Sequence, residues 1–250
     1  MTNELPRSYY SDGLIEEAVQ ENRKKLENEP ANHMLRCSLA NGLARLGNYE
    51  EAIVHYEECV RLNPSAEYWN NLGKALLNAG RYEEAVNSFA KVIEKQKWPD
   101  AYFHQALAYR SLNNLEKANE QLSEAIKINP RYREALNERA HILEALDRKD
   151  DALTEYKKVI ALFFAEYQAH DAEDYSYETS VLLDNNELIE ELIRQLRHHI
   201  QKFPGFADGY YKLGQALEAK GLKNEAMMAF RKALEINPSY ETARKCFWKR

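Results

Sequence analysis

The feature that most constrains the fold of this chain is a series of alanines spaced 33 or 34 residues apart. They are Ala18, Ala52, Ala85, Ala118 and Ala152. Each ends a hexapeptide, of which GNYEEA and GRYEEA are the clearest copies, and the series returns at Ala226 after a break. A fixed period of this length indicates repeated structural units stacked into a solenoid.

A series of prolines runs in step with the alanines. Most fall 12 residues after the alanine position; Leu192 holds that position before Pro204, and Pro99 is displaced by two residues. The hexapeptide supplies Gly, Asn or Asp for a left-handed turn, and acidic residues that favour a helix start follow it. Apolar residues recur at steps of three and four between these marks. Each unit is therefore predicted to be two antiparallel helices, with the proline marking where the second one has ended.

Two units carry the fullest pattern. One reads Trp69-x2-Leu72-Gly73-x2-Leu76 and then Ala85-x3-Phe89; the other reads Tyr210-x2-Leu213-Gly214-x2-Leu217 and then Ala226-x3-Phe230. These residues resemble the tetratricopeptide repeat, whose 34-residue pattern is W-x2-L-G-x2-Y, then A-x3-F, then P. The resemblance implies an all-α fold, a right-handed α-α superhelix in which each hairpin covers the next. Small residues such as Gly73 are expected where two helices cross closely, and large ones such as Phe89 between hairpins.

The period predicts one solenoid domain with irregular ends and an irregular middle. Its expected parts are an N-terminal segment and half repeat with a single helix (1–32), repeats at 33–65, 66–98 and 99–132, a repeat with an extended second helix (133–166), an insertion and degenerate repeat (167–206), a repeat at 207–240 and a C-terminal capping helix (241–250). Because no proline follows Val159, the helix before the insertion is expected to run past Phe164. The second helix of the degenerate repeat is expected at 187–202.

Composition narrows the classes of function. A net charge of −6 argues against a nucleic-acid-binding protein. Three cysteines without short spacings argue against a disulfide framework or a zinc site, and Cys59 is expected to be inert core. The longest apolar run, 159–165, is far below the roughly 20 residues that span a bilayer, and the start of the chain resembles no secretory signal. A cytoplasmic protein without membrane insertion is expected.

Catalytic signatures are missing from the sequence. It contains no phosphate-binding loop, dinucleotide-binding, nucleophile-elbow or zinc-protease motif. The histidines do not have metal-ligand spacings. We therefore expect no enzyme activity, no cofactor and no metal.

The family resemblance places the binding site on the concave surface, which the first helix of each repeat lines. Carried over position by position, the residues expected to face this groove are Asn41, Arg45, Asn70, Lys74, Asn78, Phe103, Leu107, Arg110, Asn137, His141, Tyr211 and Gln215. Their amides suit a peptide backbone, which offers both donors and acceptors. The resemblance implies a partner protein that presents an extended peptide or a helix.

Some members of the family bind carboxylate termini of chaperone peptides through a clamp of Lys and Asn side chains. The corresponding places here hold Cys37 and Asn41, then Asn71, then Phe103 and Leu107. The basic residues of the clamp are missing, so this function is not implied. Asparagines also form no regular ladder like that of the repeats attached to sugar transferases.

Residues 159–193 have an unusual composition. This segment has nine acidic residues and no Lys or Arg, and it contains Phe163, Phe164, Tyr167, Tyr175 and Tyr177. It is interpreted either as an acidic patch for a basic or amphipathic partner segment or as a solvated helix face above extra core aromatics. The second interpretation is favoured.

The sequence thus predicts a non-enzymatic scaffold or adaptor that binds a partner protein in the groove. The alternatives are a chaperone or assembly factor for a client such as a secretion or pilus component, and a scaffold that self-assembles as a homo-oligomer through its N-terminal helix. An enzyme subunit is a further alternative, without a motif to support it.

Overall fold

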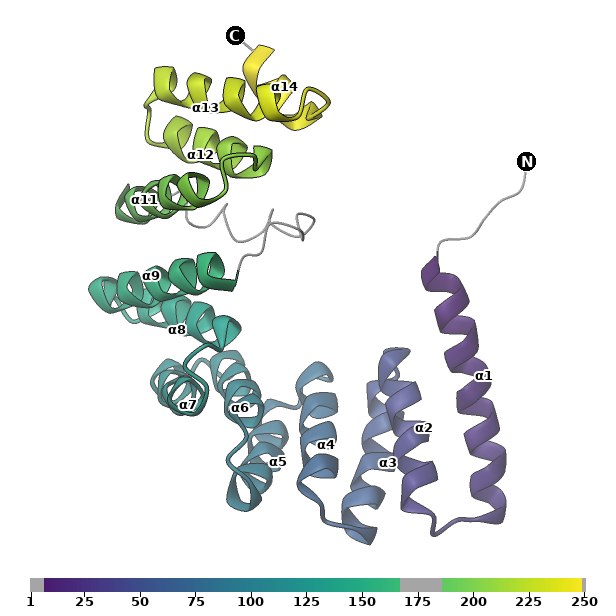
Figure 1. Cartoon of the computed structure of the whole chain (residues 1–250). Coiled ribbons are helices and arrows are strands. Elements are labelled where there is room, and N and C mark those ends of the chain that lie inside the picture. Colours follow the sequence, from purple (N-terminus) through teal and green to yellow (C-terminus); the bar gives the residue numbers. More distant parts are fainter. Residues whose placement is uncertain (1–6, 167–185, 249–250) are drawn as a thin grey trace, which may run out of the picture. The chain divides into compact units, whose positions relative to one another are not determined.

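A computed structural model describes residues 7–166 and 186–248, and within them the side chains of 13–162 and 188–246. Every regular element in these ranges is a helix (Figure 1), which confirms the predicted all-α fold. The chain divides into two compact units, residues 1–147 and 148–250. Each unit is described by itself.

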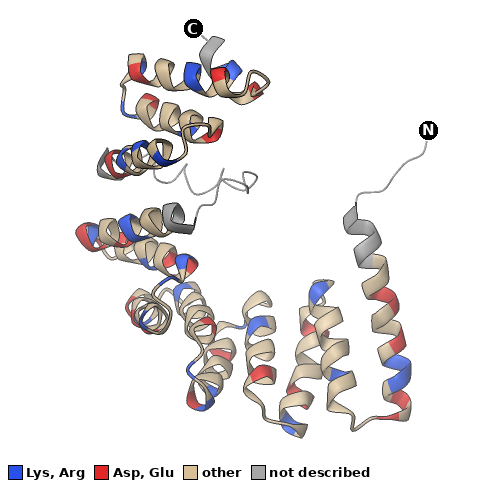
Figure 2. Cartoon of the chain, viewed as in Figure 1, with Lys and Arg blue, Asp and Glu red and all other residues tan. Residues whose placement is uncertain are grey.

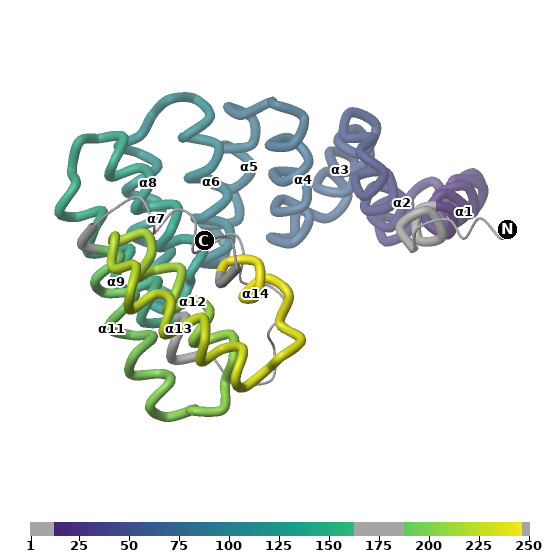
Figure 3. Tube along the Cα trace, turned by 90° about the horizontal axis from the view of Figure 1, so that it is seen from above, coloured from purple at the N-terminus to yellow at the C-terminus, as the bar shows by residue number. Residues whose placement is uncertain are grey.

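Unit 1 is built from eight helices within the described residues. They are α1 (Arg7–Asn28), α2 (His33–Arg45), α3 (Tyr49–Leu62), α4 (Ala66–Asn78), α5 (Tyr82–Lys95), α6 (Pro99–Ser111), α7 (Leu115–Ile128) and α8 (Arg133–Ala145). Each packs against the next along the chain, as the view from above shows for α2 to α6 (Figure 3). The even-numbered helices are the first helices of the predicted repeats.

The turns inside the hairpins adopt the predicted left-handed backbone. Gly47 and Gly80 have φ of 80° and 79°, and Asn113 and Asp147 take the same region with φ of 56° and 58°. Glycine, asparagine and aspartate tolerate this conformation better than other residues. The hexapeptide is therefore a helix stop followed by a helix start.

The alanine series marks the most closely packed points of the hairpins. Ala52, Ala85 and Ala118 have 0% of their surface exposed. Ala18 is an exception to the series, because its side chain is exposed. The buried stripe of α1 runs instead through Val19 and Leu26, the side that α2 covers.

Unit 2 continues the same construction. Its described helices are α9 (Lys149–Glu166), α11 (Asn186–Lys202), α12 (Ala207–Ala219), α13 (Lys223–Ile236) and α14 (Glu241–Trp248). Helix α9 runs past Phe164, as the missing proline predicts, and α11 begins within one residue of the predicted helix. Helix α11 packs against both α9 and α12, and α13 packs against α12 and α14.

The predicted insertion near 167–172 and the first part of the degenerate repeat lie outside the described residues. Most of the acidic, aromatic segment 159–193 falls there as well, so both interpretations of it stay predictions. Most of the described helices carry both acidic and basic residues (Figure 2). None of the helices searched, all of them within the described ranges, is long and apolar enough to cross a membrane.

Candidate protein-binding site

The first helices of unit 1 are joined to one another by polar side chains. We call the side of unit 1 on which these side chains of α2, α4, α6 and α8 lie the first-helix face. Between α2 and α4, His33 Nδ1 lies 2.8 Å from the hydroxyl of Tyr68. Between α4 and α6, Lys74 Nζ lies 2.7 Å from Asp100 Oδ2. Each tie joins the first helix of one hairpin to the first helix of the next, so the face is continuous from α2 to α6.

Asp100, in the first turn of α6, has the most contacts on this face. Its carboxylate also lies 3.2 Å from Nδ1 of His104, and it accepts a hydrogen bond of 3.3 Å from the Tyr132 hydroxyl. These partners, His104 first and then Lys74, hold the pKa of Asp100 well below its usual range, although burial opposes the shift. Asp100 is therefore a fixed negative charge between three helices.

The two aromatic partners of this carboxylate, His104 and Tyr132, both pack against a third ring. The ring of Phe103 lies 5.2 Å from that of Tyr132 and 5.3 Å from that of His104, measured between centroids. Burial and the Asp100 carboxylate raise the pKa of Tyr132, so its hydroxyl remains a donor. Phe103 is only partly buried and offers an apolar surface beside the charged group.

The predicted asparagines have different surroundings. Asn41 is exposed, and its side-chain oxygen accepts a hydrogen bond of 2.5 Å from the hydroxyl of Tyr56 on α3. Asn70 is only 8% exposed, and its Oδ1 is buried without a hydrogen-bond partner. An unpaired acceptor of this kind is costly unless a donor reaches it. The Asn70 side chain is therefore largely buried beneath the face, and little of it is exposed to a partner.

The other predicted residues of unit 1 differ in exposure and in contacts. Arg45 and Asn78 are exposed near the ends of α2 and α4, and Leu107 is partly buried. Arg110 pairs with Glu138 of α8, which extends the face to that helix. Asn137 Nδ2 lies 3.4 Å from Nε2 of His141 one turn later.

The two predicted residues of unit 2 form a separate pair on α12. Gln215 donates a hydrogen bond of 3.1 Å to the hydroxyl of Tyr211, whose ring lies 5.1 Å from that of Tyr240. Tyr240 in turn donates to Asp208, the position that Asp100 holds in unit 1. Unit 2 therefore repeats the tyrosine–aspartate tie of unit 1.

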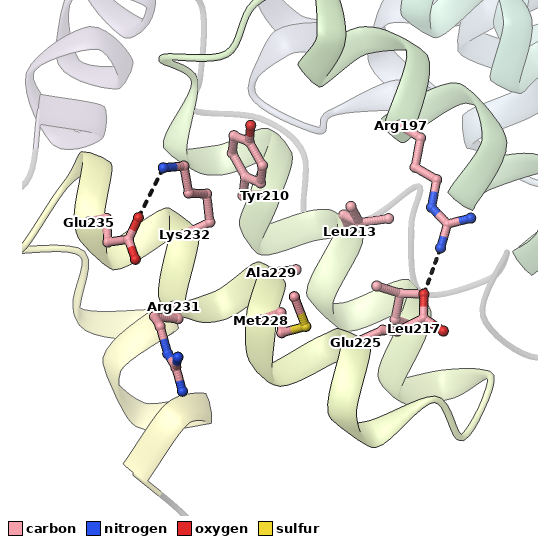
Figure 4. A pocket seen from close by; sticks show the side chains of 10 residues that line it. All are labelled: Arg197, Tyr210, Leu213, Leu217, Glu225, Met228, Ala229, Arg231, Lys232 and Glu235. Atoms are coloured by element: carbon pink, nitrogen blue, oxygen red, sulfur yellow. Dashed lines mark hydrogen bonds and ion pairs between the residues drawn. The ribbon is translucent and has the colours of Figure 1, made fainter.

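A cavity of about 450 Å³ lies in unit 2 between α11, α12 and α13 (Figure 4). Leu213, Leu217 and Ala229 are among its apolar lining residues. Two ion pairs lie at it: Arg197 with Glu225 at 2.7 Å, and Lys232 with Glu235 at 2.9 Å. The sequence indicated no concavity here.

Sequence reasoning missed the residues that organise the first-helix face. Asp100 and Tyr132 were not among the predicted site residues, nor were His33 and Tyr68. Asp100 and Tyr132 are 32 residues apart, and His33 and Tyr68 are 35 residues apart. Both separations are close to the repeat length, which is the sequence signal that could have identified these pairs. Among the described residues, no three His, Cys, Asp or Glu side chains gather as metal ligands would.

Comparison with known proteins identifies the family. Family models described as tetratricopeptide repeat match residues 37–102, 99–132 and 207–240. The chain belongs to the tetratricopeptide repeat family. The matched ranges include the two units with the fullest sequence pattern, which confirms the predicted resemblance.

Curated relatives match parts of the chain. The Hsp70-Hsp90 organising protein of Plasmodium falciparum is 32% identical over 94 residues, which is 37% of this chain and 37% of that protein. The small glutamine-rich tetratricopeptide repeat-containing protein of Dictyostelium discoideum is 36% identical over 98 residues, 39% of this chain and 29% of the relative. The tetratricopeptide repeat chain therefore spans well under half the length of these curated relatives.

Solved structures share the fold. A MamA fragment from Desulfovibrio magneticus RS-1 superposes with a TM-score of 0.59 at 22% identity, over 62% of this chain and 88% of that one. In a structure of the APC/C hetero-tetramer Cut9-Hcn1, the TM-score is 0.53 at 13% identity, over 93% of this chain and 45% of the other. At these identities the likeness extends to the fold alone.

Proposed function

We propose that this tetratricopeptide repeat chain is a protein-interaction scaffold or adaptor, and that the first-helix face of unit 1 binds a segment of its partner. The observation that carries the proposal is the row of partly exposed side chains that cross-helix ties hold along α2, α4, α6 and α8. Family membership supports it, because tetratricopeptide repeats bind proteins. The Plasmodium relative is named as an organising protein for two others, which supports a scaffold in general.

The chemistry of the face favours a peptide with both polar and apolar contacts. Amides at Asn41 and Asn137 offer donors and acceptors to a peptide backbone, and Asn70 lies buried on α4. Phe103 and the neighbouring Tyr132 ring offer a place for an apolar or aromatic side chain. The predicted residues of α12, Tyr211 and Gln215, would add a second contact region in unit 2.

The proposal includes several further expectations about the class of protein. We expect the protein to have no enzymatic activity and to bind no nucleic acid. We also expect it to be located in the cytoplasm. A chaperone or assembly factor for one client remains the alternative within the same binding mode. It would be recognised if a co-purifying client became insoluble without this chain.

The test uses a double variant of the face and a matched control. The chain is first used as bait to identify a partner, and affinity is then measured by calorimetry. The variant Asn70→Ala with Lys74→Ala is expected to lose partner binding. Asn87→Ala with Lys91→Ala changes the same residue types at the same spacing on the exposed side of α5, and it is expected to bind like the unchanged chain.

Circular dichroism must show that both double variants keep their helix content. Unchanged affinity in the Asn70 and Lys74 variant would refute the first-helix face as the site. Loss of affinity in the control variant alone would move the site to the opposite side of the same hairpin.

Self-association through α1 is a second candidate, favoured by one observation. Leu14 on this helix is 68% exposed, and Ala18 one turn later is exposed as well. We expect light scattering to show an average mass that rises with concentration, and Leu14→Lys to suppress the rise. A strict monomer over a wide concentration range would refute this candidate.

A further inference from the structure

Two thiols face each other across the hairpin formed by α2 and α3. Cys37 is 5% exposed and Cys59 is 0% exposed. Cys59 Sγ lies 3.5 Å from the carbonyl oxygen of His33, one turn before Cys37. Tyr56, about one turn before Cys59, donates to Asn41, one turn after Cys37. In an antiparallel pair these two contacts place the side chain of Cys59 beside that of Cys37, and both belong to the same buried core cluster.

The thiol pair is confined to this hairpin among the repeats that the sequence aligns. The same two places, one on the first helix and one on the second, hold other pairs in later repeats: Asn70 with Val92, Phe103 with Ala125, and Tyr211 with Ala233. Alanine at the second place is fully buried in both cases. Alanine, valine and cysteine all fit this buried place, and a cysteine adds reactive chemistry to it.

The surroundings make the two thiols unequal. The neighbouring Cys59 thiol lowers the pKa of Cys37, burial opposes this shift, and the Asn71 side chain acts in the same direction as Cys59. The neighbouring Cys37 sulfur raises the pKa of Cys59, and burial raises it further. Cys37 therefore loses its proton first. A thiolate with a second thiol in contact is the arrangement in which one sulfur attacks an oxidant and the other resolves the product.

We propose that Cys37 and Cys59 are a redox pair, which a peroxide converts into a disulfide that joins α2 to α3. The Cys37 thiolate attacks one peroxide oxygen, the O–O bond breaks, and the departing oxygen leaves as water after taking up a proton. Cys37 is then a sulfenic acid. Cys59 gives up its proton and attacks the Cys37 sulfur, and the S–OH bond breaks to release a second water. The two thiols together lose two electrons, which reduce the peroxide.

The disulfide would act on the first full repeat. It encloses the 21 residues between the two cysteines, including the turn at Gly47. A cross-link of this kind restricts the unfolded chain and so stabilises the folded one. We therefore expect oxidation to raise the melting temperature and a reductant to reverse the change. This inference does not depend on the proposed function, because its tests measure free thiols and the melting temperature and not partner binding.

The experiment uses the full chain carrying Cys246→Ser, which removes the third cysteine. Hydrogen peroxide is the oxidant, and intact mass, thiol titration after unfolding and peptide mapping are the readouts. The expected product is a monomer that has lost two hydrogens, contains no free thiol and yields a cross-linked peptide with Cys37 and Cys59. Two free thiols remaining in the folded chain, or dimers linked through these cysteines, would overturn the proposal.

A second variant tests the order of attack. Cys59→Ala in the same background places alanine where Ala125 and Ala233 already occupy equivalent positions, so the hairpin is expected to fold. Without the resolving thiol, the sulfenic acid of Cys37 should persist and be trapped by dimedone. If the folded variant gives no dimedone adduct under conditions that label the unfolded chain, Cys37 is not the attacking thiol and the proposed order is wrong.

Discussion

Two neighbouring hairpins of unit 1 place different pairs of residues at the same closely packed point. In the hairpin of α4 and α5, Gly73 faces Phe89; in that of α6 and α7, the equivalent residues are Ala106 and Leu122. A Cβ atom on Gly73 would lie 2.7 Å from Cε1 of Phe89. Ala106 and Leu122 are both fully buried in one core cluster. In the hairpin of α2 and α3 the equivalent residues are Ala40 and Tyr56, so it is the close contact with the Phe89 ring that leaves no room for a methyl group at Gly73.

Unit 2 repeats the first solution. A Cβ atom on Gly214 would lie 2.5 Å from Cε1 of Phe230. Glycine inside a helix costs about 0.5–1 kcal/mol relative to alanine, so its use at both places indicates that the close ring contact is worth more. Glycine with phenylalanine and alanine with leucine are thus two of the small–large pairs that hold these places, and alanine with tyrosine is a third.

The largest expected effect comes from removing the large member of a pair. Phe89 is 0% exposed, and replacing such a side chain with alanine leaves a cavity, so Phe89→Ala should lower the free energy of unfolding by about 3–5 kcal/mol. Trp69→Ala should cost less, because Trp69 is only partly buried. Denaturant unfolding followed by circular dichroism measures both. An equal or larger loss for Trp69→Ala would contradict the assignment of Phe89 as the central residue.

Adding a methyl group opposite the ring should have the next largest effect. Gly73→Ala forces the buried Phe89 ring to move, and overpacking of this kind costs about 1–3 kcal/mol. In a Phe89→Leu background the same change should cost little, because that pair then matches Ala106 with Leu122. A double-mutant cycle measures the coupling. Additive losses would show that the two sites do not share one space.

Replacing alanine with glycine in the other hairpin measures how much stability glycine costs when leucine, and not phenylalanine, lies opposite. Ala106→Gly removes a fully buried methyl group, so it should destabilise unit 1 by about 1–2 kcal/mol through helix propensity and lost burial together. Combined with Leu122→Phe, the glycine should become favourable relative to Ala106 in the same background. Unfolding of the four variants gives the comparison. A glycine that stays unfavourable opposite phenylalanine would break the parallel between the hairpins.

These pairs were accessible from the sequence, and the polar ties of the face were not. The repeat pattern places Gly73 and Phe89 in the core because size and spacing alone identify them. It also predicted the turns at Gly47 and Gly80 and the long helix α9. Size and periodicity carry this information because close packing acts on every repeat alike.

Individual polar contacts depend on side-chain reach and on which helix faces which, and periodicity specifies neither. Asp100 meets Lys74 from the preceding hairpin and Tyr132 from the following one. Asn70 has the position of a surface residue in the pattern but is 8% exposed. The contact between Cys37 and Cys59 was missed for the same reason, since each residue alone gives no sign of a reactive thiol.

The smallest expected change in stability comes from breaking the ion pair that links the hairpin of α4 and α5 to the hairpin of α6 and α7. Lys74 and Asp100 have side chains that are 38% and 42% exposed, so water screens their attraction. Lys74→Ala should therefore change the free energy of unfolding by less than about 1 kcal/mol at pH 7. Asn70 is left unchanged in this variant, so that only the ion pair is tested.

The pH dependence gives this prediction its sign. The pKa of Asp100 is lower in the folded chain than in the unfolded one, so its stabilising contribution is fully present above the unfolded value of about 3.9. It is lost as the pH falls through the folded pKa. The difference between the unchanged chain and Lys74→Ala should therefore stay constant from pH 8 to about 5 and shrink only in stronger acid. A difference that already changes near neutral pH would assign the stability to another titrating group, because the Asp100 carboxylate stays ionised throughout that range.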